Sequence, residues 1–259
     1  MSYGKWIGGA LGWAVGGPLG GVLGFAFGAI VDDGAKGALR TKGQDQYQKH
    51  YDPRADRQFA GQRHHTRPGD FASALLVLSA AVMKADGKYM KSELTFIREF
   101  YARQFGEAAA AEQVGVLKEL LNKDIPVREV CGQIRYYMEH PMRLQLLHYL
   151  FGLAQSDGQV DAKEAAMIRQ IALDLGISEK DYESIQAMFY KDVAHAYVVL
   201  EIEPTATDDE VKKAYRRMAV KYHPDKVRDL GEAHQKAAQE KFIKVQEAYE
   251  AVKKERGMA

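Results

Sequence analysis

The residues best suited to specific chemistry in this chain of 259 amino acids are His223, Pro224 and Asp225, which follow one another directly. They put an imidazole and a carboxylate on either side of a proline. A proline ring disfavours helical geometry in the preceding residue and ends a helix. The sequence therefore predicts that His223 and Asp225 are presented together at a turn.

Two helical patterns must hold this turn. Thr207 and Glu210 form a capping box, in which each side chain bonds the other residue's backbone N–H, so a helix is predicted to begin at Asp208 and to continue to Tyr222. Its cations after Glu210 share one broad face and meet no anion there; they are Lys212, Lys213, Arg216, Arg217 and Lys221. The opposite face is apolar. A second helix is predicted from about His234 through Val252, and a short one, Ala196–Glu201, precedes the pair.

A helical hairpin with a His-Pro-Asp tip and a basic first arm resembles a J domain, the module of DnaJ-type cochaperones, over about residues 196–256. The alternative is a small helical bundle with a solvated basic face. Two departures are a Glu201-Ile202 pair where the family has glycine, and a longer loop after the tripeptide. The resemblance implies a partner, an Hsp70 of the DnaK type, whose ATPase the domain stimulates. It also implies the contact residues: His223, Pro224, Asp225, Lys212, Lys213, Arg216, Arg217, Lys221 and Lys226. Cationic faces of this kind steer association with an acidic partner.

The middle of the chain, residues 70–192, carries apolar residues at helical spacing. Seven helices are predicted: Phe71–Asp86, Lys91–Phe105, Ala108–Leu121, Val127–Glu139, Pro141–Ser156, Asp161–Leu175 and Ser178–Tyr190. The segment contains an internal repeat, because the run from Asp86-Gly87 to Glu93 aligns with the run from Asp157-Gly158 to Glu164. Each copy predicts a helix, an Asp-Gly turn and a second helix that begins three residues before a glutamate.

A duplicated Asp-Gly turn followed by Glu in an all-helical domain resembles the TerB family, in which paired acidic residues are suspected metal ligands. We therefore take Asp86, Glu93, Asp157 and Glu164 as a candidate divalent-cation site, although no cofactor is required. EF-hand loops are excluded, because the preceding positions that should be acidic hold Val, Lys, Leu and Gln. The alternative is structural: Asp161 and Glu164 form a capping box. Met90 cannot cap, so Glu93 fits that alternative less well.

The first 31 residues have no charge between Trp6 and Val31, and glycine recurs at every fourth position. Such a stripe lets membrane helices approach closely. We predict a glycine-zipper membrane helix, with a possible homodimer contact through Gly8, Gly12, Gly16, Gly20 and Gly24. Pro18 leaves a re-entrant hairpin open, and a signal peptide or a soluble glycine-rich segment are further alternatives. Residues 32–69 are predicted to be a polar linker.

The cations that flank the apolar stretch predict its orientation. Lys5 precedes it, whereas Lys36, Arg40, Lys42 and Lys49 follow it. The positive-inside rule then leaves the bulk of the chain in the cytoplasm and predicts a single-pass protein of the inner membrane. The net charge of +1 gives no support for nucleic-acid binding. The single cysteine, Cys131, excludes an internal disulfide and is expected to be a buried thiol.

The order of anchor, linker, TerB-like domain and C-terminal J domain (residues 195–259) resembles the DjlA-like family of membrane-anchored J-domain cochaperones. The fold class is predicted to be all-α. The function that this resemblance implies is recruitment of Hsp70 to clients at a membrane. The alternative is an interaction scaffold in which the TerB-like domain senses metal or stress and the J domain is secondary. An enzyme is not expected, because no nucleophile–base pair or phosphate loop is present.

Overall fold

The computed structural model describes residues 68–87, 90–158, 160–190, 193–230 and 232–258. All regular structure in these ranges is helical, which confirms the predicted all-α class. None of the helices in the described ranges is both long and apolar enough to cross a membrane. The predicted glycine-zipper helix and residues 32–67 of the predicted linker lie outside the described residues, whereas residues 68 and 69, predicted as linker, belong to the first described helix.

The first helices form a bundle around a helix that is buried on nearly all sides. The bundle comprises α3 (Pro68–Met83), α4 (Lys91–Phe105), α5 (Glu107–Leu121), α6 (Val127–Tyr137), α7 (His140–Ala154), α8 (Ala162–Asp174) and α9 (Glu179–Ala187). In α3 every residue from Ala74 to Met83 is buried, and α5, α6, α7 and α8 pack around it. The predicted helices all exist, and the largest shifts are three residues, at both ends of α3 and at the end of α9.

The internal repeat is confirmed as two turns of the same kind. Gly87 (φ 78°) and Gly158 (φ 97°) both have positive φ, which glycine adopts at no steric cost. Each turn leads into a helix with an acidic residue in its first turn, Glu93 in α4 and Glu164 in α8. The predicted buried thiol is also confirmed. Cys131 in α6 is fully buried, and burial, followed by the nearby charge of Asp174, raises its pKa to about 12.

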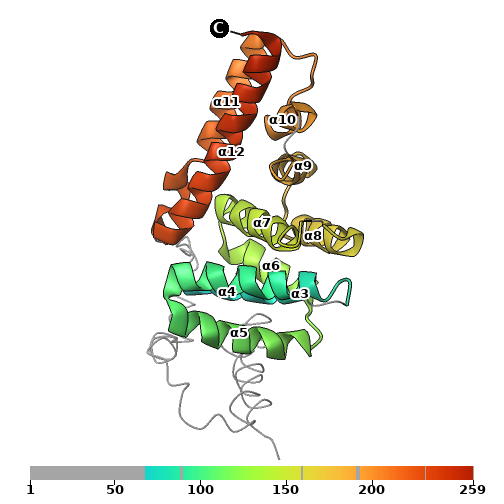
Figure 1. Ribbon diagram of the computed structural model, residues 1–259, viewed down its shortest axis with the longest axis vertical. Coiled ribbons are helices and arrows are strands. Elements are labelled where there is room, and N and C mark those ends of the chain that lie inside the picture. Colours follow the sequence, from blue (N-terminus) through green and yellow to red (C-terminus); the bar gives the residue numbers. More distant parts are fainter. Residues whose placement is uncertain (1–67, 88–89, 159, 191–192, 231, 259) are drawn as a thin grey trace, which may run out of the picture.

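The C-terminal residues form a long hairpin that stands away from the bundle (Figure 1). Its parts are α10 (Val193–Val199), α11 (Asp208–Lys221), the 3₁₀ segment η1 (Pro224–Leu230) and α12 (Glu232–Arg256). The prediction of a plain loop after the tripeptide is wrong, because η1 occupies most of it. At the end of α10, Val199 and Leu200 are buried, whereas Val198 is 38% exposed.

The chain ends of the hairpin lie far from the bundle, and the connection between its two arms lies close to it (Figure 1). There η1 packs against α3 and α7, and α12 packs against α4 and α7. The short helix α10 lies beside the two long arms, α11 and α12, and packs against α9 and α12. The tripeptide at residues 223–225 is therefore placed near the junction between the two halves of the molecule.

Candidate functional site

The His223-Pro224-Asp225 corner begins where α11 ends. Tyr222 caps the C-terminus of α11 and donates its backbone N–H to Met218 O. The side chains of His223 and Asp225 are 49% and 75% exposed, as the sequence predicts for a turn that presents them. Asp225 donates its backbone N–H to His223 Nδ1 at 3.2 Å, and the imidazole meets the ring of Phe242 edge to face. These contacts hold the imidazole in place and leave its Nε2 available as a donor.

The predicted cationic surface, which consists of Lys212, Lys213, Arg216, Arg217, Lys221 and Lys226, is mostly open to solvent. Four of its members are exposed: Lys213, Arg216, Arg217 and Lys226. Lys221 is different, since its side chain is only 22% exposed and its Nζ is paired with Asp181 of α9 and with Glu201. The structure thus keeps the corner and most of the cationic surface together, and it turns one cation inward.

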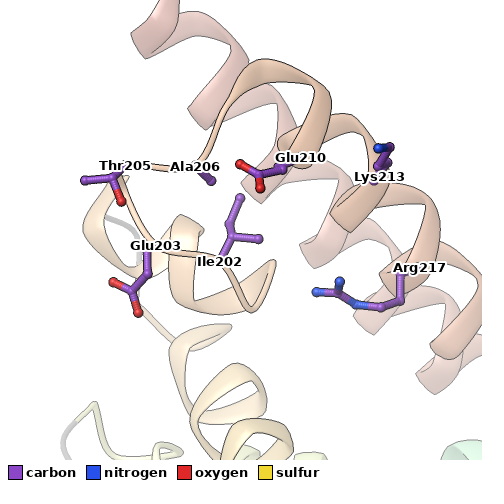
Figure 2. Close-up of a pocket in the computed structure, with 7 residues that line it drawn as sticks. All are labelled: Ile202, Glu203, Thr205, Ala206, Glu210, Lys213 and Arg217. Carbon is purple, nitrogen blue, oxygen red and sulfur yellow. The ribbon is translucent and has the colours of Figure 1, made fainter.

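A groove of about 490 Å³ borders this surface between α11 and the segment that follows α10 (Figure 2). Lys213 and Arg217 line it from α11, opposite Ile202 and Glu203. Arg217 points toward that segment and donates to Leu200 O at 3.1 Å. Glu203 and Glu210 also line the groove, so the chain partly neutralises its own cations here. Arg216 and Lys226 lie outside the groove, where this neutralisation does not reach them.

Glu201 stands where the J-domain pattern has glycine, and its backbone explains the preference. Its φ is 57°, and it is the one non-glycine residue with positive φ among the described residues. A side chain in this region is disfavoured by about 1 kcal/mol or more. The Glu201 carboxylate compensates through its ion pairs, to Lys221 and, at 3.8 Å, to Arg217. The turn at Glu201 therefore has positive φ without a glycine, and the Glu201 carboxylate adds an anion next to the cationic surface.

The far end of the hairpin is fixed by Arg256 near the end of α12. Its guanidinium donates to Pro204 O at 2.6 Å, to Tyr197 Oη at 2.8 Å and to Ala206 O. These bonds hold the segment between α10 and α11 against α12. Half-way along the hairpin, Tyr215 and Tyr249 stack with ring centroids 4.4 Å apart. Both arms are thus held in register, which sets the position of the corner.

The acidic residues predicted as a cation site are partly brought together. Glu93 and Glu164 are buried, and the charges of Asp86 and Asp157 lie close enough to affect the pKa of Glu93. Burial, and then the negative charge of Glu93, raise the pKa of Glu164 to about 7. Burial also raises the pKa of Glu93. Within the described residues, no three His, Cys, Asp or Glu side chains are arranged so that they could hold a metal ion.

Glu93 has the helix-capping role that we had assigned to Glu164 alone. Its Oε2 accepts the backbone N–H of Met90 at 2.8 Å, as Glu164 Oε2 accepts that of Asp161 at 3.3 Å. The expectation that Glu93 fits the structural alternative less well than Glu164 is therefore wrong, because the reach-back bond needs only the backbone of Met90 and not its side chain. The buried Glu93 carboxylate also lies within hydrogen-bonding reach of the Glu164 carboxyl.

Several polar residues at the junction between bundle and hairpin were not predicted. Asp181 and Lys241 are both buried, at 6% and 2% exposure. Lys241 could have been found, since it falls on the buried stripe of α12 between Ala238 and Val245. Asp181 lies in the first turn of α9, where a carboxylate is expected for local reasons. Its pairing with Lys221 depends on how the two halves pack, and local sequence does not encode that.

Comparison with known families assigns each part of the chain. Residues 195–257 match the DnaJ domain, residues 72–187 match TerB, described as tellurite resistance protein TerB, and residues 1–43 match the co-chaperone DjlA transmembrane domain. The bundle is thus a TerB domain and the hairpin is a J domain. No solved structure matches the chain.

Similar curated proteins are named as co-chaperones or chaperones. Co-chaperone protein DjlA of Shewanella oneidensis is 28% identical over 215 residues, which cover 74% of this chain and 80% of the relative. The protein of the same name from Vibrio parahaemolyticus is 27% identical over 229 residues, with the same coverage. Chaperone protein DnaJ of Neisseria meningitidis is 54% identical over 56 residues, which are 22% of this chain and 14% of the relative. The high identity is thus confined to the J domain.

Proposed function

Because a J domain, a TerB domain and the transmembrane segment of DjlA-like co-chaperones occur in one chain, we propose that this protein is a membrane-tethered co-chaperone. In this proposal the J domain stimulates the ATPase of a DnaK-type Hsp70 and recruits it to clients near the membrane. The observation that carries the proposal is the exposed His223–Asp225 corner next to a solvent-exposed cationic surface. The relatives named co-chaperone support it.

The surface suggests a division of labour between its residues. Exposed cations such as Arg216 attract an acidic partner over a distance, so they affect the association rate and its dependence on salt. His223 and Asp225 are held by backbone and ring contacts, so they suit short-range polar contacts that select one state of the partner. Neither residue needs to transfer a proton for this role.

The test is the ATP hydrolysis rate of a DnaK-type Hsp70 in the presence of the full-length chain in detergent micelles. We expect His223→Gln and Asp225→Asn to reduce the stimulation to the background rate. Asp209→Asn is the matched control, because Asp209 is an exposed aspartate in the first turn of α11, away from the corner. Stimulation by Asp225→Asn at the wild-type level would refute the proposal.

We propose further that the N-terminal segment crosses the inner membrane once and leaves both folded domains in the cytoplasm, where ATP is available to an Hsp70. The excess of cations after the apolar stretch supports this orientation. A protease added to intact spheroplasts should leave the J domain uncut, and carbonate should leave the chain in the membrane. The stripe from Gly8 to Gly24 would pair two copies, so Gly12→Leu and Gly16→Leu should reduce cross-linked dimers in micelles.

A second proposal concerns the acidic pair of the TerB domain. We propose that Glu93 and Glu164, with Asp86 and Asp157 turning toward them, bind a divalent cation, which would support the alternative role of a metal-sensing scaffold. The observation that favours it is the pair of buried carboxyls, Glu93 and Glu164, which lie within hydrogen-bonding reach of each other. Calorimetry with Ca²⁺, Mg²⁺ and Zn²⁺ should show heat that Glu93→Gln with Glu164→Gln abolishes. Equal heats for wild type and this double variant would end the proposal.

A further inference from the structure

One buried carboxylate of the TerB domain forms an ion pair with the J domain. Oδ1 of Asp181 in α9 forms an ion pair with Lys221 of the J domain. Oδ2 of the same carboxylate lies 3.3 Å from Nε2 of His140. Burial acts to raise the pKa of Asp181, but the bonds from His140 and Lys221 outweigh it and hold the pKa well below its usual range. The carboxylate is therefore charged, and much of its stabilisation comes from the other domain.

The buried apolar cluster of the molecule spans both domains, and several polar groups are buried beside it at the junction. Tyr222 is 3% exposed, and its hydroxyl lies within hydrogen-bonding reach of the Ser184 side chain of α9. Lys241 lies over the Tyr222 ring, 5.4 Å from Nζ to the centroid. Its charge is close enough to His148 of α7 to help lower the pKa of that residue, after the larger effect of burial. Thus α12 places a buried lysine where it meets the TerB domain.

A junction of this composition is suited to opening. Permanent interfaces are largely apolar, whereas buried ion pairs gain little net free energy, because desolvation offsets their attraction. On separation Tyr222, Lys221, Asp181 and Lys241 would all regain water. The docked arrangement therefore has a modest advantage over an open one, compared with a junction of the same size built from apolar side chains.

The docked arrangement also restricts the surface on which the proposed function depends. Lys221 is one of the cations proposed to contact Hsp70, and here it is paired with Asp181 and Glu201. The segment η1, which includes Pro224 and Asp225, packs against α3 and α7 of the TerB domain. The corner remains accessible to solvent, but a large partner must approach it next to the TerB bundle.

We propose that the TerB surface around Asp181 is a docking site for the J domain of the same chain, and that it competes with Hsp70 for Lys221 and the adjoining corner. This inference rests on the proposed function and adds its regulation: the TerB domain sets the fraction of J domains free to engage the chaperone. A partner's apparent affinity is reduced by the fraction of the protein in the competent state. Weakening the docking site must therefore make the co-chaperone more potent.

The experiment compares full-length variants in detergent micelles for two properties. One is the concentration of co-chaperone that gives half-maximal stimulation of a DnaK-type Hsp70. The other is the hydrogen exchange of the backbone amides in η1 and α9. Asp181→Asn should lower the half-maximal concentration about threefold or more and speed exchange in both segments. Lys241→Met removes a buried cation from the junction and should shift both properties the opposite way.

Glu179→Gln is the matched control for Asp181→Asn. Glu179 is an acid in the same helical turn, but it pairs with Arg169 at the exposed surface. It should leave both properties at the wild-type values. If Asp181→Asn speeds exchange and leaves the half-maximal concentration unchanged, the domains dock without competing with Hsp70, and the proposal is wrong. If neither property changes, Asp181 is not a docking residue, and the proposal is wrong for that reason.

Failure of the proposed function would look different. In that case wild type would give no stimulation that His223→Gln removes, whatever the exchange data show. Competition with Hsp70 would then be refuted together with the proposed function, and the exchange of η1 and α9 would still report whether Asp181 holds the two domains together. An Asp181→Asn variant that loses the unfolding transition in circular dichroism would be replaced by His140→Gln, which removes the second contact to the same carboxylate.

Discussion

Glu164 of the TerB domain and Glu210 of the J domain occupy the same position of the same motif, three residues after the helix cap. Each accepts the backbone N–H of its cap residue, Asp161 in one case and Thr207 in the other. Burial and Glu93 raise the pKa of Glu164 to about 7. Bonds from the backbone and side chain of Thr207 lower the pKa of the exposed Glu210. The same motif thus carries a glutamate whose charge the fold disfavours, Glu164, and one whose charge it favours, Glu210.

The cations of two helices of the J domain, α11 and α12, also differ in whether the fold favours their charge. Those of α11 that face solvent, such as Lys213 and Arg216, keep their hydration and remain available to a partner. Lys241 of α12 has the TerB domain on one side and Tyr222 on the other, and burial lowers its pKa to about 7. The J domain thus exposes cations along α11 and buries one where α12 packs against the TerB domain. Removal of Lys241, whose charge the fold disfavours, should stabilise the protein.

The largest effect is expected for Lys241→Met, which replaces the buried cation by an apolar side chain of similar length. The folded-state pKa of about 7 lies below the ordinary 10.5, so the fold disfavours the charged lysine at pH values below about 10. We expect the free energy of unfolding to increase by about 2 kcal/mol at pH 7 and by less at pH 9. Urea unfolding of the full-length chain, followed by circular dichroism, measures it.

Lys244→Met is the control on the same helix. Lys244 is one turn from Lys241, but it pairs with Glu247 at the surface, where such pairs contribute little. It should change stability by less than about 0.5 kcal/mol at either pH. If Lys241→Met leaves stability unchanged, as this control does, or lowers it, then the fold does not disfavour the charge of Lys241. Buried and exposed lysines of α12 would then not differ.

A smaller gain is expected for Glu164→Gln in the TerB domain. An acid whose pKa is raised in the folded state stabilises the fold below its unfolded pKa, here 4.5, and loses that contribution as pH rises through about 7. Glutamine can still accept the N–H of Asp161, and it carries no charge. The free energy of unfolding should rise by about 1 kcal/mol at pH 8 and be unchanged near pH 4. An equal effect at both pH values would point to packing rather than to charge.

Much of the fold could be predicted from sequence because its signals are local. Apolar spacing gave every helix of the TerB domain, and Gly87 and Gly158 marked turns that require positive φ. The capping boxes of α8 and α11 lie where the sequence places them. The corner at residues 223–225 is exposed as expected, because Pro224 ends the helix through its own ring geometry and needs no distant contact to do so.

The features that were missed depend on contacts between distant segments. Local sequence does not indicate that Asp181 meets Lys221, or that Lys221 leaves the cationic surface to do so. The reach-back bond of Glu93 uses the backbone N–H of Met90, which almost any residue type supplies, so the methionine side chain gives no signal for it. The departure from glycine at Glu201 was visible in the sequence, but its consequence, an anion that holds Lys221, required the packed structure.

The smallest effect, and of opposite sign, is expected for Glu210→Gln in the J domain. Its pKa is lowered in the folded state, so its charge stabilises the fold above the unfolded pKa of 4.5, and this contribution disappears as pH falls below that value. The charge also faces the N-terminus of α11, where the helix dipole favours an anion. Glu210→Gln should therefore lower the melting temperature of the J domain slightly at pH 7 and leave it unchanged near pH 3. Because Glu164→Gln makes the same chemical change at the same motif position, the two melting curves measured side by side isolate burial as the variable. A gain in stability from both variants would mean that the motif itself, and not its surroundings, determines how the glutamate charge acts.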